Sequence, residues 1–271
     1  MSLSIVVLNY NGKEFLPRCL DAVFSQGLPS DREVLLIDNS STDKSEVEAH
    51  NTFPIDSLIR GDNKHQFITG LNLAFKHAKY ENVLFVTNDV IMQPWSIHKL
   101  YSLIIKVPKS LIQPVFYTEA KKIQNAGMEY HWPGYGLAET FVSDGPYYST
   151  DIVTTTAFIM NKSAFKEIGP FDVNFAPGGY EDVDYSLRAK ALGYERLVAG
   201  SAIATHLTSK SFTPVYGKRG ISDICYKNRT YLIDKYYSGL DRWLRQTVNH
   251  AVRSIHTLSN GKSNSLKAGS S

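Results

Sequence analysis

Cysteine is scarce in this chain, and neither charge dominates. Among 271 residues only Cys19 and Cys225 are cysteines, which excludes a disulfide framework and a paired-cysteine metal site. The formal net charge of +3 comes from scattered lysines and arginines without a basic block interleaved with aromatics, so nucleic-acid binding is not indicated. So few cysteines fit a reducing compartment, and we expect a cytoplasmic protein.

Long hydrophobic runs are also missing. The apolar run 3–8 is broken by Asn9 and lacks the basic lead and cleavage pattern of a signal peptide, which favours a buried strand. No segment approaches the length that spans a bilayer. With 43% hydrophobic residues, the chain can bury the core of one large α/β domain or two small ones.

Continuous apolar runs alternate with helical spacing in the first part of the chain. Strands are predicted at 4–8, 34–37, 57–60 and 83–86, and helices at 15–24, shortly after 43, at 71–78 and at 95–105. This alternation predicts a parallel sheet covered by helices on both faces. Ligand groups lie at the carboxyl ends of such strands, which points to Asn9, Asp38, Asn88 and Asp89.

The second part of the chain changes character. Residues 113–150 are rich in tyrosine, glycine and proline without a sustained period, which predicts ordered loops or a β-ribbon. Strands are expected again at 154–160 and 197–204, the second leading to His206. Two helices, at 221–237 and 243–258, precede a Gly/Ser/Lys-rich end that is typical of disorder. These helices either cover the sheet or rest on a membrane.

A glycine pair at 178–179 comes directly before a predicted helix start that carries Glu181, Asp182 and Asp184. Glycines let the backbone turn sharply and approach a ligand, so one interpretation is a catalytic carboxylate. The other is that Glu181 and Asp182 cap the helix and complement its dipole. The helix N-terminus is expected to lower the pKa of Asp182.

The polar groups at the strand ends also have two interpretations each. Asp38 can accept hydrogen bonds from a nucleobase imide or a ribose hydroxyl, or it can form a turn that caps the next helix. Asp89 can hold a hard divalent cation or act as a cap. His206 is either structural or completes a metal site together with diphosphate oxygens and water. The loop after it brings Lys210 as a point charge for phosphates.

An aromatic loop at 130–136 includes Trp132, whose ring is suited to stacking on the C–H face of a sugar. Packing of a β-ribbon explains the same pattern equally well, because amphipathic aromatic residues serve both uses. The loop is therefore a candidate wall for a sugar acceptor, with core packing as the alternative.

Six segments resemble, in order and approximate spacing, family 2 inverting glycosyltransferases. They are IVVLNYN at 5–11, IDNSSTD at 37–43, GDN at 61–63, TNDV at 87–90, EDVD at 181–184 and residues 206–212. The resemblance covers about residues 3–215 and implies a single GT-A (Rossmann-like) α/β domain with a mixed sheet, most similar to rhamnosyltransferase-like members. We expect this domain at 1–219, with a nucleotide-sugar half (1–110) and an acceptor half (111–219), then a helical extension (220–260) and a disordered tail (261–271).

The resemblance implies a role for each matching residue. We assign donor binding to Asn9, Asp38, Asn63, Asn88 and Lys210, acceptor binding to Trp132 and Tyr180, and an Mn²⁺ or Mg²⁺ site to Asp89 and His206. Asp182 matches the family's general base, with Glu181 in support. Thr87 stands where the family's metal motif has its first acid, so this chain departs from that pattern.

These parts predict an inverting transfer from a UDP- or dTDP-linked sugar, with rhamnose as one candidate, to a hydroxyl of a glycan or glycolipid. One carboxylate takes the proton of that hydroxyl while a cation stabilises the departing diphosphate. A noncatalytic sugar-binding module and a sugar nucleotidyltransferase are the alternatives, but NYNGKE at 9–14 is not the glycine-rich basic loop that the second needs. No G-x-G-x-x-G opens the first helix, which disfavours a dinucleotide oxidoreductase. Peripheral membrane contact and a homo-oligomer both fit this assignment.

Overall fold

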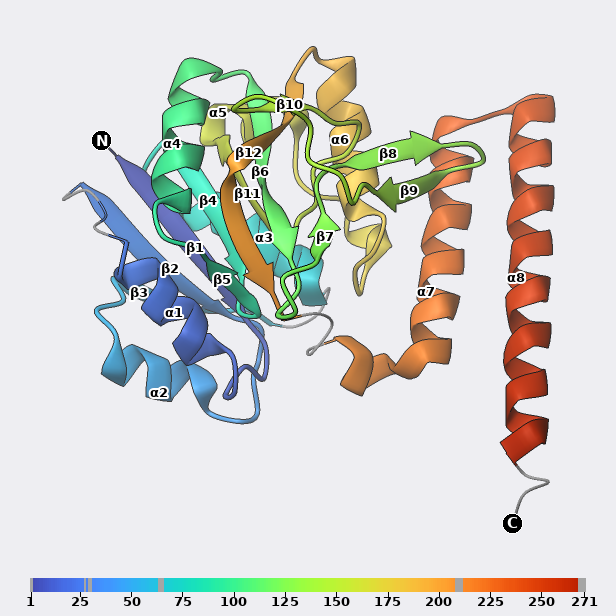
Figure 1. Cartoon of the computed structure of the whole chain (residues 1–271), viewed down its shortest axis with the longest axis horizontal. Coiled ribbons are helices and arrows are strands. Elements are labelled where there is room, and N and C mark those ends of the chain that lie inside the picture. The colour runs from blue at the N-terminus through green and yellow to red at the C-terminus, as the bar shows by residue number, and fades with distance from the viewer. Residues whose placement is uncertain (1, 27, 29–30, 63–65, 208–211, 268–271) are drawn as a thin grey trace.

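A ten-stranded mixed sheet forms the centre of the molecule (Figure 1). This computed structural model describes residues 2–26, 28, 31–62, 66–207 and 212–267. The strands are β1 (Leu3–Asn9), β2 (Arg32–Asp38), β3 (Ser57–Arg60), β4 (Asn82–Thr87), β5 (Val90–Met92), β6 (Ser110–Tyr117), β7 (Ile123–Asn125), β10 (Tyr148–Ser149), β11 (Ala157–Asn161) and β12 (Glu195–His206). Their order is β10-β12-β6-β11-β4-β1-β2-β3, with β5 paired to β12 and β7 to β6.

The sheet is parallel from β3 to β4 and mixed beyond β4. β3, β2, β1 and β4 run parallel to one another, as the alternating pattern predicts. β11 is antiparallel to both β4 and β6, and β12 is parallel to β6. The mixed α/β sheet that the family resemblance implies is therefore confirmed, and the parallel arrangement predicted from the alternating pattern holds for β1 to β4.

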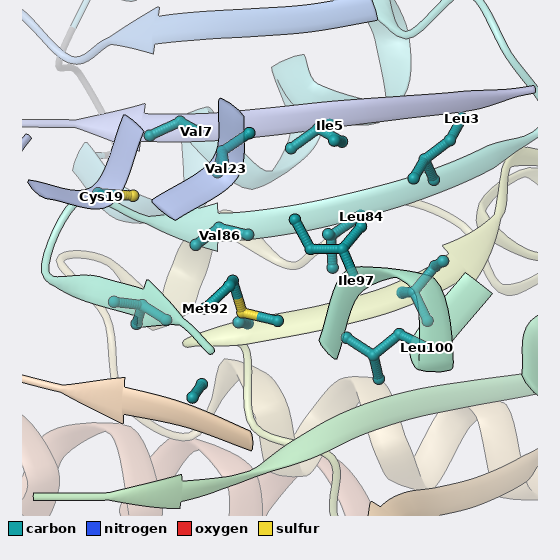
Figure 2. Close-up of a cluster of buried hydrophobic side chains, with 14 of the residues drawn as sticks. Leu3, Ile5, Val7, Cys19, Val23, Leu84, Val86, Met92, Ile97 and Leu100 are labelled. Atoms are coloured by element: carbon teal, nitrogen blue, oxygen red, sulfur yellow. The ribbon is translucent and has the colours of Figure 1, made fainter. Parts of the chain in front are cut away.

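Alternate residues of each central strand face the two sides of the sheet. Leu3, Ile5 and Val7 of β1 pack against α1 (Leu16–Phe24) and α4 (Ser96–Lys106), as Figure 2 shows. Val6 and Leu8 face the other side. The helices on that side are α3 (Gln66–His77), α5 (Lys162–Ile168) and α6 (Glu181–Ala191). α2 (Ser45–Thr52) lies beside α1, so helices cover both faces of the sheet. The polar carboxyl ends of the strands lie outside these two covered faces.

Strand β6 lies where the sequence predicts loops or a ribbon. Pro114 interrupts its apolar pattern, and Gln113 puts a polar side chain at a fully buried position. Pro114 is tolerated because the pairing register between β6 and β12 shifts at its partner Ala199, so the ladder does not need its missing N–H there. Gln113 accepts a hydrogen bond from the Thr154 amide and donates one to Asn125. The tyrosine-rich stretch after β6 forms the hairpin β8 (Met128–His131) and β9 (Tyr135–Ala138).

Two long helices, α7 (Phe212–Tyr236) and α8 (Gly239–Lys267), form a hairpin beside the domain (orange and red in Figure 1). Both are predicted. A kink at Gly217, whose backbone is not helical, divides α7, and the part after the kink begins close to the predicted residue 221. α8 continues through Lys267 into the segment for which disorder was expected. Extending an existing helix is cheaper than starting one, and residues 239–267 contain no proline to stop it. No helix in the described part of the chain is long and apolar enough to cross a membrane.

Candidate active site

A cavity of about 360 Å³ opens at the carboxyl ends of the central strands. Its wall includes Asp89 after β4, His206 at the end of β12, and Glu181 and Asp182 at the start of α6. The size is that of a small-molecule site. Residues from the two halves of the chain that the sequence marks as candidates therefore line one space.

Asn9, Asp38 and Asn88 form a buried network beside this cavity. Asn9 and Asp38 are paired neighbours at the ends of β1 and β2, and the Asn9 Nδ2 donates to Asp38 Oδ1 at 2.9 Å. Asn88 Nδ2 donates to Asn9 Oδ1 at 2.8 Å. Asp38 also accepts hydrogen bonds from the backbone N–H and the hydroxyl of Ser41. These two bonds form the turn that was the alternative interpretation of Asp38. Of the three, only Asn88 lines the cavity, so donor contacts of Asn9 and Asp38 stay predictions.

Gly12 explains why the turn after β1 has its particular sequence. A Cβ atom at this position would lie 2.2 Å from both Asn88 Nδ2 and Asn9 Oδ1. Any other residue would therefore push apart the amide pair that joins β1 to the turn after β4. The backbone N–H of Gly12 also contacts the hydroxyl of Ser45, at 3.3 Å. Gly12 is a site residue that sequence reasoning missed, although its place next to Asn9 and Asn11 was visible.

Asp89 and His206 form the candidate metal pair. Asp89 as a residue is 4% exposed, and its Oδ2 lies 3.4 Å from His206 Nε2. Burial alone would raise the pKa of Asp89, but the His206 and Thr87 hydrogen bonds outweigh it and the pKa is lowered. The hydroxyl of Thr87, which replaces the acid of the family motif, donates to Asp89 Oδ1 at 2.7 Å. Asp89 is thus held ionised.

The donor set of this pair fits Mn²⁺ better than Mg²⁺. A carboxylate oxygen suits both cations, whereas an imidazole nitrogen is a poor ligand for the harder Mg²⁺. Within the described ranges, no group of three or more His, Cys, Asp or Glu side chains is arranged to hold a metal ion. Oxygens from a bound diphosphate and from water would have to complete the coordination.

Glu181 and Asp182 lie where α6 begins, and both carboxyl groups are perturbed. Burial, followed by the adjacent carboxylate of Glu181, raises the pKa of Asp182 to about 8. Burial also raises the pKa of Glu181, whose Oε1 accepts a hydrogen bond from Thr155 Oγ1 at 2.7 Å. The expected lowering by the helix N-terminus is therefore wrong in sign, because desolvation and a like charge outweigh the dipole. The described residues place no cation in an ion pair with Asp182.

Asp184 has a different task from its neighbours. Its side chain is fully buried, and Arg188 Nε, Lys235 Nζ and the Tyr236 hydroxyl contact its carboxylate at 2.9, 2.7 and 2.8 Å. A carboxylate with two cations and a hydroxyl as partners is a structural anchor between α6 and α7. The acidic cluster at 181–184 thus divides into two groups at the cavity and one in the core.

The remaining predicted residues do not reach this cavity or cannot be placed. Trp132 is 53% exposed in the β8–β9 turn, where the guanidinium of Arg245 stacks over its ring at 5.9 Å. Tyr180, with φ of 74°, precedes α6 and its hydroxyl accepts a hydrogen bond from Arg229. Neither is part of the cavity wall, so acceptor binding by both stays a prediction. Asn63 and Lys210 lie outside the described residues.

Several wall residues were not predicted. Thr154, Thr155 and Thr156 line the cavity just before β11, and Thr155 holds Glu181. Three consecutive hydroxyl residues at a strand start were a usable signal. Ile221 and Cys225 of α7 also line the cavity, and no local sequence signal placed them there.

The chain is similar in sequence to known proteins. Residues 4–169, more than half of the chain, match the sequence family described as Glycosyl transferase family 2. The chain belongs to this glycosyltransferase family. An uncharacterized glycosyltransferase of Haemophilus influenzae is 27% identical over 128 residues, which are 47% of this chain and 42% of that protein. The chain therefore spans less than half the length of this relative.

Two solved glycosyltransferase structures share the fold. The crystal structure of GalNAc-T7 with UDP, GalNAc and Mn²⁺ superposes with a TM-score of 0.65 and 16% identity, covering 76% of this chain and 43% of that one. The mannosyltransferase PcManGT of Pyrobaculum calidifontis, in complex with GDP-Man and Mn²⁺, gives a TM-score of 0.61 and 14% identity over 94% of this chain and 69% of that one. At such identities the likeness establishes the GT-A fold of this chain and nothing further.

Proposed function

We propose that this chain transfers a sugar from a nucleoside-diphosphate sugar to a hydroxyl acceptor by a single displacement. One observation carries the proposal: the cavity that contains the Asp89–His206 pair is also lined by Asp182. A noncatalytic nucleotide-sugar-binding module would need the Asp89–His206 pair but no general base such as Asp182. Membership of the glycosyltransferase family and the metal- and nucleotide-bound GT-A relatives support the same assignment.

Asp182 is the proposed general base. Its raised pKa makes it a stronger base than an ordinary aspartate, and a base works best when its pKa is close to the working pH. It takes the proton from the acceptor hydroxyl as that oxygen bonds to the anomeric carbon and the diphosphate leaves with the bonding electrons. Glu181, held by Thr155, keeps a like charge beside Asp182 and orients the acceptor. No covalent enzyme intermediate is needed, so the anomeric configuration inverts.

Asp89 and His206 are the proposed metal ligands. A divalent cation there would neutralise the diphosphate and stabilise it as a leaving group. The described residues of the cavity wall include three carboxylates and no lysine or arginine, so a diphosphate entering it needs such a counter-charge. Metal dependence, with Mn²⁺ preferred over Mg²⁺, is part of the proposal.

The donor and the acceptor are proposed by chemical class. A hexose or rhamnose carried by UDP or dTDP is the proposed donor, with rhamnose supported only by the Asn-Asp pair at 88–89. The proposed acceptor is a glycan or glycolipid, for which the exposed aromatic ring of Trp132 supplies a stacking surface outside the cavity. Peripheral contact with a membrane through the α7–α8 hairpin and self-association are compatible proposals.

A panel of UDP-, dTDP- and GDP-sugars, each with and without Mn²⁺, tests the function. Thermal shift reports binding, because a ligand of the native state raises its apparent stability. Release of nucleoside diphosphate reports consumption of the donor, and NMR of the product reports its anomeric configuration. We expect one class of nucleotide-sugar to bind in the presence of Mn²⁺ and to release its nucleoside diphosphate slowly. The anomeric configuration of the transferred sugar should be inverted. Binding without any consumption, with or without glycan acceptors, would favour the noncatalytic module.

A further inference from the structure

Asn228 of α7 contacts the loop that leads to the catalytic carboxylates. The side chain is fully buried, and its Nδ2 lies 2.8, 3.1 and 2.9 Å from the carbonyl oxygens of Phe175, Gly178 and Gly179. Two N–H hydrogens are thus shared among three carbonyls. The Oδ1 of Asn228 has no hydrogen-bond partner in the described part of the chain. All hydrogen bonds of the Asn228 side chain there are therefore donated by Nδ2 to the 175–180 loop.

The loop itself has an unfavourable backbone. Gly178, Gly179 and Tyr180 have consecutive φ values of 149°, 91° and 74°, and Tyr180 is a non-glycine residue in the left-handed region. Such a conformation persists only where surrounding contacts hold it. Glu181 follows directly, so the path of this loop sets where α6 starts and where Asp182 points.

The inward face of α7 combines this contact with the cavity wall. Ile221 and Cys225 line the cavity, Asn228 holds the loop, and Leu232 is fully buried in the domain core. These positions are spaced by three and four residues and so lie on one side of the helix. A helix that only covered the sheet would need no buried amide aimed at backbone carbonyls.

We infer that Asn228 is a positioning residue for the glycosyl transfer: its amide fixes the Gly178–Tyr180 turn and thereby the placement of the Asp182 carboxylate against the donor. The inference rests on the proposed function, since it assigns Asn228 to the site of that reaction. The proposed donor contacts lie at the strand ends, with which Asn228 has no hydrogen bond among the described residues. A loss of catalysis with intact nucleotide binding is therefore expected when Asn228 is changed.

Asn249 offers a matched control within the same hairpin. It is also a fully buried asparagine, and it joins α8 to α7 through Arg229 and Thr230. Its link to the loop is indirect, because Arg229 donates to the side-chain hydroxyl of Tyr180, whereas Asn228 bonds to the loop backbone itself. Asn228→Leu and Asn249→Leu both remove a buried amide while keeping the number and branching of the side-chain heavy atoms, so both add the same extra volume. The two variants should lose comparable stability, so a difference between them reports the contact with the loop.

The experiment compares these variants in the full chain. With the donor that the wild type consumes, we expect Asn228→Leu to lower kcat about 100-fold, the loss expected for a misplaced catalytic group, with the donor KM and the Kd for the nucleoside diphosphate and Mn²⁺ within about twofold. Asn249→Leu should keep kcat within about threefold. Equal losses of kcat in both variants, or a loss that appears in Kd, would overturn the inference.

Hydrogen exchange of the amides at 178–184 provides a second readout that needs no activity. Exchange should be faster in Asn228→Leu than in Asn249→Leu, because only the first variant removes hydrogen bonds to the loop backbone. Unchanged exchange in Asn228→Leu refutes the inference whatever the chain catalyses. If the wild type releases no nucleoside diphosphate from any donor, the proposed function fails, while the exchange comparison still decides whether Asn228 holds the turn.

Discussion

Asp182 and Asp184 lie two residues apart on α6, yet the same substitution should change stability in opposite directions. Asp184 is fully buried and has Arg188, Lys235 and Tyr236 as partners. Breaking a buried ion pair costs about 3–5 kcal/mol. Because the amide of Asp184→Asn keeps some hydrogen bonds, we expect the lower end, about 3 kcal/mol. At roughly 2–4 °C per kcal/mol, Tm falls by about 6–12 °C.

Asp182→Asn should instead stabilise the fold at alkaline pH. The pKa of this carboxyl is raised from 3.8 to about 8, so its stabilising effect is present below the first value and is lost as pH rises through the second. A rise of one in the pKa corresponds to about 1.4 kcal/mol in the free energy of unfolding. Solvent contact and the shared titration with Glu181 reduce the full sum, and we expect a gain of about 1–2 kcal/mol near pH 9.

Thermal unfolding of the wild type and both variants at about pH 5 and about pH 9 measures these effects. The Tm advantage of Asp182→Asn over the wild type should be larger at the higher pH. Asp184→Asn should be less stable than the wild type at both. If Asp182→Asn proved less stable than the wild type at high pH, the raised pKa and the burial argument behind it would be refuted.

Two further changes probe the donor side of the cavity. Gly12→Ala places a methyl group 2.2 Å from the amides of Asn9 and Asn88, so we expect at least a tenfold loss in affinity for the nucleoside diphosphate, about 1.4 kcal/mol, by calorimetry. An unchanged Kd would show that the network does not support donor binding. Asp89→Ala should abolish the Mn²⁺-dependent part of the thermal shift produced by the same nucleotide. A manganese titration identical to that of the wild type would exclude Asp89 as a metal ligand.

Local sequence patterns could predict the donor side of the site. A buried apolar strand followed by a polar turn is a short-range feature, and it correctly placed Asn9, Asp38 and Asp89 at one edge of the sheet. The internal hydrogen bonds of Asp38 were also among the interpretations, because Asx turns are local. Only the structure shows what the turn residues contact in the folded chain. An example is the close approach of Gly12 to the side-chain amides of Asn9 and Asn88.

Long-range contacts explain what the sequence could not predict. The pKa of Asp182 depends on burial in the folded domain and on the Glu181 carboxylate, so the local rule for helix N-termini had the wrong sign. Asn228 and Gly178 are fifty residues apart, and no pattern pairs them. Strand β6 was missed because Pro114 and Gln113 break its apolar pattern, and only its neighbours in the sheet make both residues acceptable.

The rate of nucleoside diphosphate release by Asp182→Asn, measured at saturating donor and Mn²⁺, tests the central claim most directly. We predict a fall of about 10²–10⁴-fold relative to the wild type, the usual contribution of a general base, with the Kd for the nucleoside diphosphate unchanged within about twofold. Because Asn is isosteric with Asp, the fold and the donor contacts should persist. Release at the wild-type rate by a correctly folded variant would contradict the assignment of Asp182 as the base.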